Sequence, residues 1–329
     1  MKSAAIKQMV TSAFVLVTML GFATSASAQK FPSKPIHIIL PFAVGGLLDA
    51  TLRAIGPAIS QSVGQPVLVE NKPGGGTFIG MEACARAAPD GYTICVTTPD
   101  SLVYNPYLYT QVPYDAEKDF APVTNLVFTN NIIVATRNAP FNSFKEMIAY
   151  AKANPGKVTW ATWGSGSIPH VYLEAVNRAF NVDILQVPYK GAGQAYPAVL
   201  SGESQVTYGG LGFSLAQMKE GNLKALAVTP DASPLVPGVP TMRELGAEPG
   251  LPSYFGVFAP AKTPPAVVET LSAEIAKALA QPKVREFLQA QTLQPVGNPP
   301  AEFAAFVAKD RENAREVFKA MGLKPSAAP

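Results

Sequence analysis

Cysteine and histidine are scarce in this sequence of 329 residues, which holds two of each. Cys84 and Cys95 do not form a CxxC pair, and only His37 and His170 are available to complete a four-ligand zinc site. We therefore expect no metal. The two cysteines fall on a predicted helix and on the strand after it. There they either form a disulfide or pack as small buried apolar side chains.

Motifs for nucleotide binding and for catalysis are also missing. There is no GxxxxGK[ST] run, residues 71–80 lack the GxGxxG fingerprint, and "GSGS" (164–167) lacks the spacing of a GxSxG nucleophile elbow. No pair of carboxylates stands out for acid–base chemistry. We expect neither a cofactor nor an enzyme. The alternative enzyme hypothesis is a secreted serine hydrolase, which would use Ser167 with His170 because His37 lies within a predicted strand.

A large excess of one charge is absent once the N-terminus is set aside. Lys2 and Lys7 precede the uncharged run "AFVLVTMLGFA" (13–23), and the small residues "ASA" (26–28) follow. This pattern predicts a signal peptide over residues 1–28, and its apolar run is too short for a membrane span. Removing the two lysines from the 26 basic residues leaves 24 against 23 acidic ones. We expect an exported, soluble protein with no nucleic-acid or membrane-surface partner.

Apolar strand-like runs alternate with amphipathic helical stretches along the chain. The runs are "IHIIL" (36–40), "VLVE" (67–70), "YTICVTT" (92–98), "NIIVAT" (131–136), "VTWATW" (158–163), "ILQVPY" (184–189), "QVTYGG" (205–210), "LKALAVT" (223–229) and "YFGVFAP" (254–260). The alternation predicts an α/β fold with parallel sheets and helices on both faces. Residues 29–128 with 251–329 are predicted to form one lobe and residues 129–250 a second, with a hinge and a cleft between them.

Four glycine-bearing loops follow predicted strands and open predicted helices. They are "PFAVGGLLD" (41–49), "NKPGGGTFIG" (71–80), "GSGSIPH" (164–170) and "YKGAGQ" (189–194). Ligands of open α/β sheets bind beyond the carboxyl ends of the strands, and free N–H groups at helix starts attract anions. Any one loop alone is also typical of a plain turn. Four in equivalent positions favour one anion site shared by both lobes.

These loops, together with the signal peptide, resemble the Bug-type (TctC-like) solute receptors of tripartite tricarboxylate transporters. The pieces that carry the resemblance are "FPSKPIHIILPFAVGGLLD", "ENKPGGGTFIG", "ARAAPDGYTI", "YNPYLY", "PYDAEKDFAPVT", "GSGSIPH" and "VPYKGAGQAYPAVLSGE", in this order. The resemblance implies a type II-like periplasmic binding protein with two lobes, each a mainly parallel sheet flanked by helices. It also implies a carboxylated ligand, a location in the periplasm and membrane permease subunits as partners. We expect a monomer.

The resemblance further implies which residues bind the ligand. The loops at 41–49 and 74–80 would hold one carboxylate through backbone groups and ordered water, and the second lobe would hold the rest. We expect Asp49 to cap its helix and fix the first loop. Lys190 either adds charge or is a solvated lysine, and the aromatic candidates either line the site or belong to the core. The full set of candidates is Phe42, Gly46, Leu48, Asp49, Gly75, Gly76, Thr77, Ser101, Tyr104, Ser165, Ser167, His170, Lys190 and Gly191.

The sequence departs from the family pattern in three places. Leu48, preceded by Leu47, replaces a small hydroxyl residue, "TPDSLVYNP" (98–106) lacks the usual histidine, and "GESQ" (202–205) replaces GxVD. The leucines lead to the hypothesis of a carboxylate with an apolar middle, such as the aromatic dicarboxylate terephthalate. Alternatively, both leucines face the core of the lobe. A sensor subunit that presents its ligand to a membrane kinase is a further functional alternative.

Overall fold

Strands and helices alternate from Ile36 to Met321, as the sequence predicts. The structure is a computed structural model that describes residues 31–322, 325 and 327. The predicted signal peptide and its cleavage site lie outside the described residues. The chain from Lys34 onward forms one compact unit, which contains two sheets.

The first sheet has six strands in the order β11-β4-β10-β3-β1-β2. Its strands are β1 (Ile36–Leu40), β2 (Val67–Asn71), β3 (Thr93–Thr97), β4 (Phe120–Thr129), β10 (Tyr254–Pro260) and β11 (Leu293–Pro295). Strand β1 pairs in parallel with β2 and β3, whereas β10 runs antiparallel to both β3 and β4. Every residue of β10 is buried, so this strand lies in the centre of the lobe.

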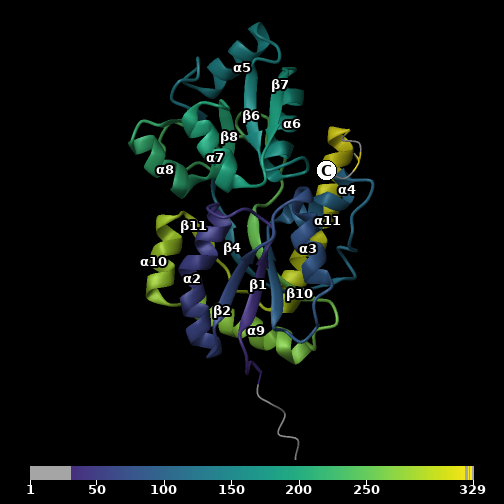
Figure 1. Cartoon of the computed structure of the whole chain (residues 1–329). Helices are drawn as coiled ribbons and strands as arrows, with labels where there is room; N and C mark the ends of the chain where they lie inside the picture. The colour runs from purple at the N-terminus through teal and green to yellow at the C-terminus, as the bar shows by residue number, and fades with distance from the viewer. Residues whose placement is uncertain (1–30, 323–324, 326, 328–329) are drawn as a thin grey trace, which may run out of the picture. The chain divides into compact units, whose positions relative to one another are not determined.

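Helices cover both faces of the first sheet. They are α2 (Leu47–Val63), α3 (Phe78–Ala85), α4 (Asn105–Leu108), α9 (Pro265–Leu279), α10 (Pro282–Ala290) and α11 (Pro300–Met321), with the short turns η1 (Gly75–Thr77) and η2 (Asp100–Tyr104). Figure 1 shows α2 and α10 on one flank of the sheet and α3 and α11 on the other. Helix α2 buries Leu52, Ile55 and Ile59, which share one face of the helix. The packing of this face against the lobe holds the first turn of α2 beside the end of β1.

The second sheet has five strands in the order β7-β6-β8-β5-β9. These are β5 (Asn131–Thr136), β6 (Val158–Thr162), β7 (Ile184–Pro188), β8 (Val206–Gly210) and β9 (Leu223–Thr229), and the helices are α5 (Phe144–Ala153), α6 (Ile168–Phe180), α7 (Ala192–Ser201) and α8 (Leu211–Lys219). Figure 1 shows α7 and α8 on one flank of this sheet and α6 on the other. We call the parts of the chain around the two sheets the first lobe and the second lobe.

The sheets contain more antiparallel pairs than the sequence pattern predicts. Strand β5 pairs antiparallel with β8 and β9, just as β10 does with β3 and β4. The cause is the passage of the chain between the sheets: Asn130 alone separates β4 from β5, and β10 follows the return from the second lobe. Strands β5 and β10, which come directly after the chain has passed from one lobe to the other, therefore run antiparallel to their neighbours. The predicted lobe boundaries at residues 128 and 250 stay a prediction.

Two local features complete the fold. Cys84 of α3 and Cys95 of β3 form a disulfide, with Cα atoms 6.0 Å apart, which decides between the two alternatives for these cysteines. Among the described residues, no helix combines the length and the apolar character needed to cross a membrane.

Candidate ligand-binding site

A cavity of about 150 Å³ lies where the carboxyl ends of strands from both sheets meet. An apolar cavity of roughly this size binds benzene in another protein, so the space accommodates a six-membered ring. The lining residues are Phe42, Ala43, Gly45, Gly46, Leu47, Leu48, Asp49, Thr98, Thr129, Asn131, Trp163, Ile168, Ala192, Gly193, Tyr196, Pro197, Leu200, Tyr208, Gly209, Gly210, Phe213, Ser253 and Phe255.

Two groups of side chains make up most of this lining. We call Thr98, Thr129, Trp163, Tyr208 and Ser253 the polar wall: the rings of Trp163 and Tyr208 lie 6.2 Å apart, and the Thr129 hydroxyl donates to the Ser253 hydroxyl at 2.7 Å. We call Leu47, Leu48, Tyr196, Leu200 and Phe213 the apolar wall, in which the Tyr196 and Phe213 rings meet edge to face at 4.8 Å. The cavity therefore suits a ligand with an apolar body and a polar end.

Four helices begin at the cavity. Gly46 and Gly210, which precede α2 and α8, line it, and so do the first residues of α6 and α7, Ile168 and Ala192. The first N–H groups of a helix have no partner within the helix, and they carry the positive end of the helix dipole. Among the described residues, Asp49 is the one charged side chain in the lining. An anion in this cavity would thus be held by backbone N–H groups.

Asp49 organises the loop between β1 and α2. Its carboxylate accepts hydrogen bonds from the Gly45 N–H at 3.0 Å, from Arg53 at 3.1 Å and from the Asn71 side chain at 3.0 Å. Burial alone would raise the pKa of Asp49, but these donors outweigh it and hold the pKa below its usual value. Asp49 is therefore ionised and satisfied by its own chain, in a position where it fixes the loop.

Asp100 of η2 is a second buried carboxylate, and it bonds to the first turn of α6. Its Oδ2 accepts from the Trp163 indole N–H at 3.0 Å and from the Ile168 N–H at 3.3 Å, so a first-lobe carboxylate bonds to the first turn of a second-lobe helix. Burial raises the pKa of Asp100 against the lowering effect of these donors. Asp100 is not among the predicted ligand-binding residues, although it lies in "TPDSLVYNP", one of the departures from the family pattern.

Glycines allow the two lobes to approach each other beside the cavity. A Cβ atom on Gly193 would overlap the carbonyl oxygen of Val44, and a Cβ atom on Gly210 would overlap the Leu47 side chain. A Cβ atom on Gly191 would lie 3.2 Å from the Ala43 backbone nitrogen. The loop after β1 is thus in direct contact with the starts of α7 and α8.

Four of the predicted site residues line the cavity: Phe42, Gly46, Leu48 and Asp49. All four belong to the loop and helix start that follow β1. Leu48 lines the cavity while 6% of its surface is exposed, and Leu47 is also in the lining, so the structure places both leucines at the pocket rather than in the lobe core alone.

The first lobe's other candidates are not among the residues that line the cavity. Gly75, Gly76 and Thr77 form η1, all with positive φ, and the Asn105 side chain donates to the Gly76 carbonyl at 2.9 Å and to the Thr77 hydroxyl at 3.2 Å. Two further candidates sit in the core: the hydroxyl of Ser101 pairs with that of Thr97 at 2.5 Å, and the hydroxyl of Tyr104 donates to the Pro252 carbonyl at 3.2 Å. Their role in ligand binding stays a prediction.

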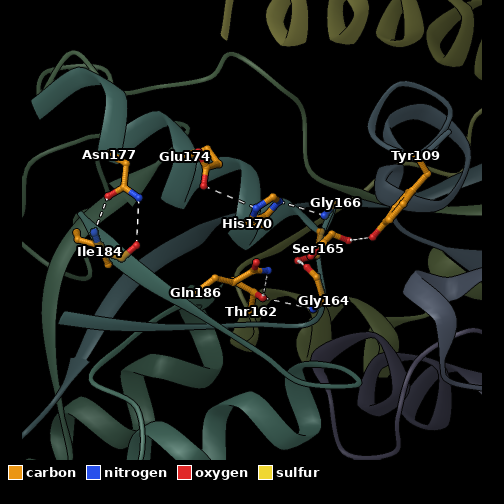
Figure 2. A network of polar contacts seen from close by, with 11 residues as sticks. Tyr109, Thr162, Gly164, Ser165, Gly166, His170, Glu174, Asn177, Ile184 and Gln186 are labelled. Atoms are coloured by element: carbon orange, nitrogen blue, oxygen red, sulfur yellow. Dashed lines mark hydrogen bonds and ion pairs between the residues drawn. The ribbon is translucent and has the colours of Figure 1, made fainter. Parts of the chain in front are cut away.

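The predicted donors on the loop before α6 bond to the protein itself (Figure 2). The carbonyl of Ser165 accepts from the Tyr109 hydroxyl, and the Ser167 hydroxyl donates to the Gly164 carbonyl at 2.6 Å. His170 accepts the Gly166 N–H at Nδ1, at 3.1 Å, which directs its Nε2 toward Glu174. Burial lowers the pKa of His170 to about 4, so its ring is neutral at neutral pH. Ser167 and His170 thus have separate partners, unlike a nucleophile and its base.

The last two candidates precede α7. Lys190 is exposed and its N–H donates to the Gln194 side chain at 3.1 Å. Gly191 is buried against Ala43 and caps α7 without lining the cavity. Whether either residue touches a ligand stays a prediction.

Several lining residues were not predicted from the sequence, because they come from strands, strand ends and helix faces rather than from the glycine loops. They are Thr98, Trp163, Tyr196, Tyr208, Phe213 and Ser253. A usable signal was present for two of them. Trp163 closes the run "VTWATW" directly after the end of β6, and Tyr208 lies within β8, just before the two glycines that end it.

The comparisons with known proteins agree with this arrangement. A family model described as "Tripartite tricarboxylate transporter family receptor", TctC, matches residues 51–323. The solved periplasmic binding protein BugD is 31% identical, with 90% of this chain and 100% of that chain covered and a TM-score of 0.85.

Two further solved structures are named with a ligand. A protein of R. palustris solved with adipate is 28% identical over 90% of this chain and 100% of its own, with a TM-score of 0.84. MatC from Rhodopseudomonas palustris, with bound malate, is 30% identical over 87% and 99%, with a TM-score of 0.82.

These matches confirm the two-lobed α/β fold and the resemblance seen in the loops. The family consists of solute-binding receptors of periplasmic type rather than enzymes, and this agrees with the separate partners of Ser167 and His170. The chain belongs to the tripartite tricarboxylate transporter receptor family.

Proposed function

We propose that this receptor captures a carboxylated small molecule in the periplasm and delivers it to the membrane permease subunits of a tripartite tricarboxylate-type transporter. One observation carries the proposal: four helices start at a single cavity between the two sheets. Adipate and malate in two similar structures are both carboxylates, which supports the same ligand class. We expect the receptor to act as a monomer, which its mass in solution would test.

The chain itself occupies one of the four helix starts, because Asp100 accepts from the first turn of α6. Asp49 accepts from the Gly45 N–H ahead of α2, and the N-cap of that helix, Gly46, has no side-chain cap. Helices α7 and α8 follow Gly191 and Gly210, and neither glycine brings a side chain that could cap the helix. We propose that the ligand carboxylate binds at these two starts, where Gly193 and Gly210 line the cavity with backbone alone.

The apolar wall narrows the ligand class. Burial of an apolar surface against Leu47, Leu48 and Phe213 contributes about 25 cal/mol for each square ångström removed from water. A hydroxyl-rich ligand would lose hydrogen bonds to water and find none on these side chains. We propose a carboxylate with an apolar middle, of which the aromatic dicarboxylate terephthalate is a candidate with a body the size of the cavity.

Calorimetry with terephthalate, adipate and citrate tests this proposal on the purified receptor. We expect terephthalate to bind most tightly and citrate most weakly, because only citrate adds a hydroxyl and a third charge to the apolar wall. Citrate as the tightest ligand would contradict the apolar-body proposal. Failure of every carboxylate to bind would contradict the carboxylate receptor itself.

Leu48→Thr tests the contribution of the apolar wall. The variant replaces a buried lining side chain by a smaller one with a hydroxyl, so terephthalate should bind roughly 5- to 30-fold more weakly, as expected for about 1–2 kcal/mol of lost burial. Affinity for citrate should hold or improve. The matched control is Leu235→Thr, since Leu235 is exposed and outside the lining. An unchanged order of preference in Leu48→Thr would argue against the apolar wall as the source of selectivity.

A further inference from the structure

Three buried polar atoms without a hydrogen-bond partner cluster at the polar wall. Within the described residues, the Thr98 hydroxyl, the Oδ1 of Asp100 and the Tyr208 hydroxyl make no hydrogen bond. Their residues are 8%, 2% and 1% exposed. Thr98 and Tyr208 line the cavity, from the first and the second lobe respectively, while Asp100 lies behind them and holds Trp163.

Such unpartnered atoms are informative because folded proteins satisfy nearly all of their buried polar groups. The Ser253 hydroxyl lies close enough to Tyr208 to lower its pKa, and the Thr98 hydroxyl lies close enough to Asp100 to lower the pKa of that carboxyl, yet neither pair meets the geometry of a hydrogen bond. Two residues that line one cavity from opposite lobes, each with a buried hydroxyl that makes no hydrogen bond, indicate a place for a polar group of a ligand. Each hydroxyl can donate one hydrogen bond and accept others.

The charges around these hydroxyls are all negative. Burial raises the pKa of Tyr208 well above its usual value, and the carboxylates of Glu248 and Asp100 add to that rise, which shows that their charges reach the hydroxyl. Asp49 is the charged residue of the lining, and the described lining contains no lysine, arginine or histidine. A second ionised carboxylate here would lose its water and face carboxylates of the protein, which is costly without a cation.

We propose that Thr98 and Tyr208 form a subsite that binds the second polar end of the ligand in an uncharged form, as a carboxamide or as a protonated carboxyl group. The inference rests on the proposed carboxylate receptor and adds the charge state of the far end of its ligand. A carboxamide and a carboxylic acid each offer a donor and an acceptor, which match two hydroxyls and a nearby carboxylate oxygen. A dicarboxylate would therefore bind as a monoanion, with one proton taken up from solvent.

The pH dependence of affinity separates the two forms of the far end. A free carboxyl group has a pKa of about 4, so the protonated fraction of a dicarboxylate falls about tenfold for each unit of pH above that value. Affinity for terephthalate should then fall by roughly 100-fold between pH 5.5 and pH 7.5. Its monoamide, 4-carbamoylbenzoate, has no second carboxyl and should change less than threefold. Titration of Asp100 or Asp49 would change the affinity of both ligands alike, so the difference between the ligands isolates the proton on the ligand.

Calorimetry of the receptor with terephthalate, 4-carbamoylbenzoate and benzoate at the two pH values is the first test. We expect the affinity for terephthalate alone to fall steeply between pH 5.5 and pH 7.5. At pH 7.5, 4-carbamoylbenzoate should bind more tightly than benzoate. Equal pH dependence of terephthalate and its monoamide would overturn the subsite, and so would equal binding of benzoate and the monoamide. If none of the three carboxylates binds, the proposed function itself fails, which is a different outcome.

Tyr208→Phe and Thr98→Val give the second test, because each removes one hydroxyl and keeps the outline of the side chain. Each should weaken 4-carbamoylbenzoate by about 3- to 10-fold, as expected for one hydrogen bond to a neutral group, and leave benzoate unchanged. Tyr208→Phe should also raise the Tm without ligand, since it removes an unpaired buried hydroxyl. Tyr150→Phe, outside the lining, is the matched control. An equal loss for benzoate and the monoamide would show a structural role and overturn the subsite.

Discussion

Two carboxylates at the cavity play similar parts but differ in their electrostatics. Asp49 accepts from the Gly45 N–H, from Arg53 and from Asn71, whereas Asp100 accepts from Trp163 and from the Ile168 N–H. The pKa of Asp49 is lowered and the pKa of Asp100 is raised. Burial raises the pKa of both groups, but the hydrogen-bond donors of Asp49, which include the Arg53 cation, outweigh it, whereas the donors of Asp100 do not.

This contrast indicates on which side of the cavity an anion would bind. Asp100 bonds to the first turn of α6 and Asp49 to the loop ahead of α2, whereas the starts of α7 and α8 follow glycines. An anion is therefore expected on the glycine side of the cavity and disfavoured on the Asp100 side. Blocking the glycine side of the cavity and neutralising each carboxylate in turn would test this difference.

Gly193→Ala should have the largest effect. The added Cβ would overlap the Val44 carbonyl oxygen, which is backbone and cannot rotate away, so the loop after β1 and the start of α7 would have to separate. We expect at least about a 100-fold loss of terephthalate affinity by calorimetry, equal to about 2.7 kcal/mol. Small-angle scattering should show that ligand compacts the wild type and no longer compacts the variant.

The matched control for that variant is Gly56→Ala in the middle of α2. A Cβ atom there would meet nothing within 4 Å, and alanine favours a helix by roughly 0.5–1 kcal/mol over glycine. This control should bind ligand normally and unfold at a slightly higher temperature. Normal affinity in Gly193→Ala would mean that close approach at α7 is not needed for binding.

Asp49→Asn should lower stability by about 1–2 kcal/mol at pH 7, because hydrogen bonds to a charged acceptor are exchanged for weaker ones. The pKa of Asp49 is lowered in the folded protein, so its contribution is complete above the unfolded value of about 3.9 and is lost as the pH falls through the folded value. Denaturant unfolding at pH 7 and pH 3 should show a difference in the free energy of unfolding between the wild type and Asp49→Asn that becomes smaller in acid. Asp231→Asn, at an exposed ion pair with Arg243, should show almost no gap at either pH.

Asp100→Asn should have the smallest effect and the opposite sign. The pKa of Asp100 is raised in the folded protein, so the wild type loses stability as the pH rises from about 3.9 toward the folded value. Asparagine keeps an oxygen for Trp163 and Ile168 without the buried charge. We expect the variant to match or exceed the wild type at pH 7 by up to about 1 kcal/mol, with the difference vanishing near pH 4. If Asp100→Asn were less stable than the wild type at pH 7 and this difference became smaller in acid, as expected for Asp49→Asn, the contrast between the two carboxylates would be refuted.

Sequence reasoning reached the first-lobe side of the cavity and missed most of the second. The loop of Gly45 and Gly46 follows a strand and opens a helix, and these two facts suffice to place it at the carboxyl edge of a sheet. Tyr196 and Phe213 lie on helix faces instead, where an aromatic residue looks the same whether it packs in a core or lines a pocket.

The turn Gly75–Thr77 shows a second limit. Its glycines indicate a close backbone approach, and the approach is real, but it involves Asn105, which lies 28 to 29 residues further along the chain. Local spacing cannot tell a ligand from a distant side chain of the same protein. Likewise, the antiparallel position of β10 depends on the return path from the second lobe, which strand periodicity does not encode.

Both tryptophans of the chain belong to one stretch of β6 and its exit, and this gives the receptor a built-in optical reporter. Trp160 is fully buried and outside the lining, whereas Trp163 lines the cavity, bonds to Asp100 of the other lobe and lies 6.2 Å from the Tyr208 ring. Changes in intrinsic emission upon ligand addition would thus arise from Trp163. Trp163→Phe would leave only the silent background of Trp160, so occupancy could be followed by fluorescence without any attached dye.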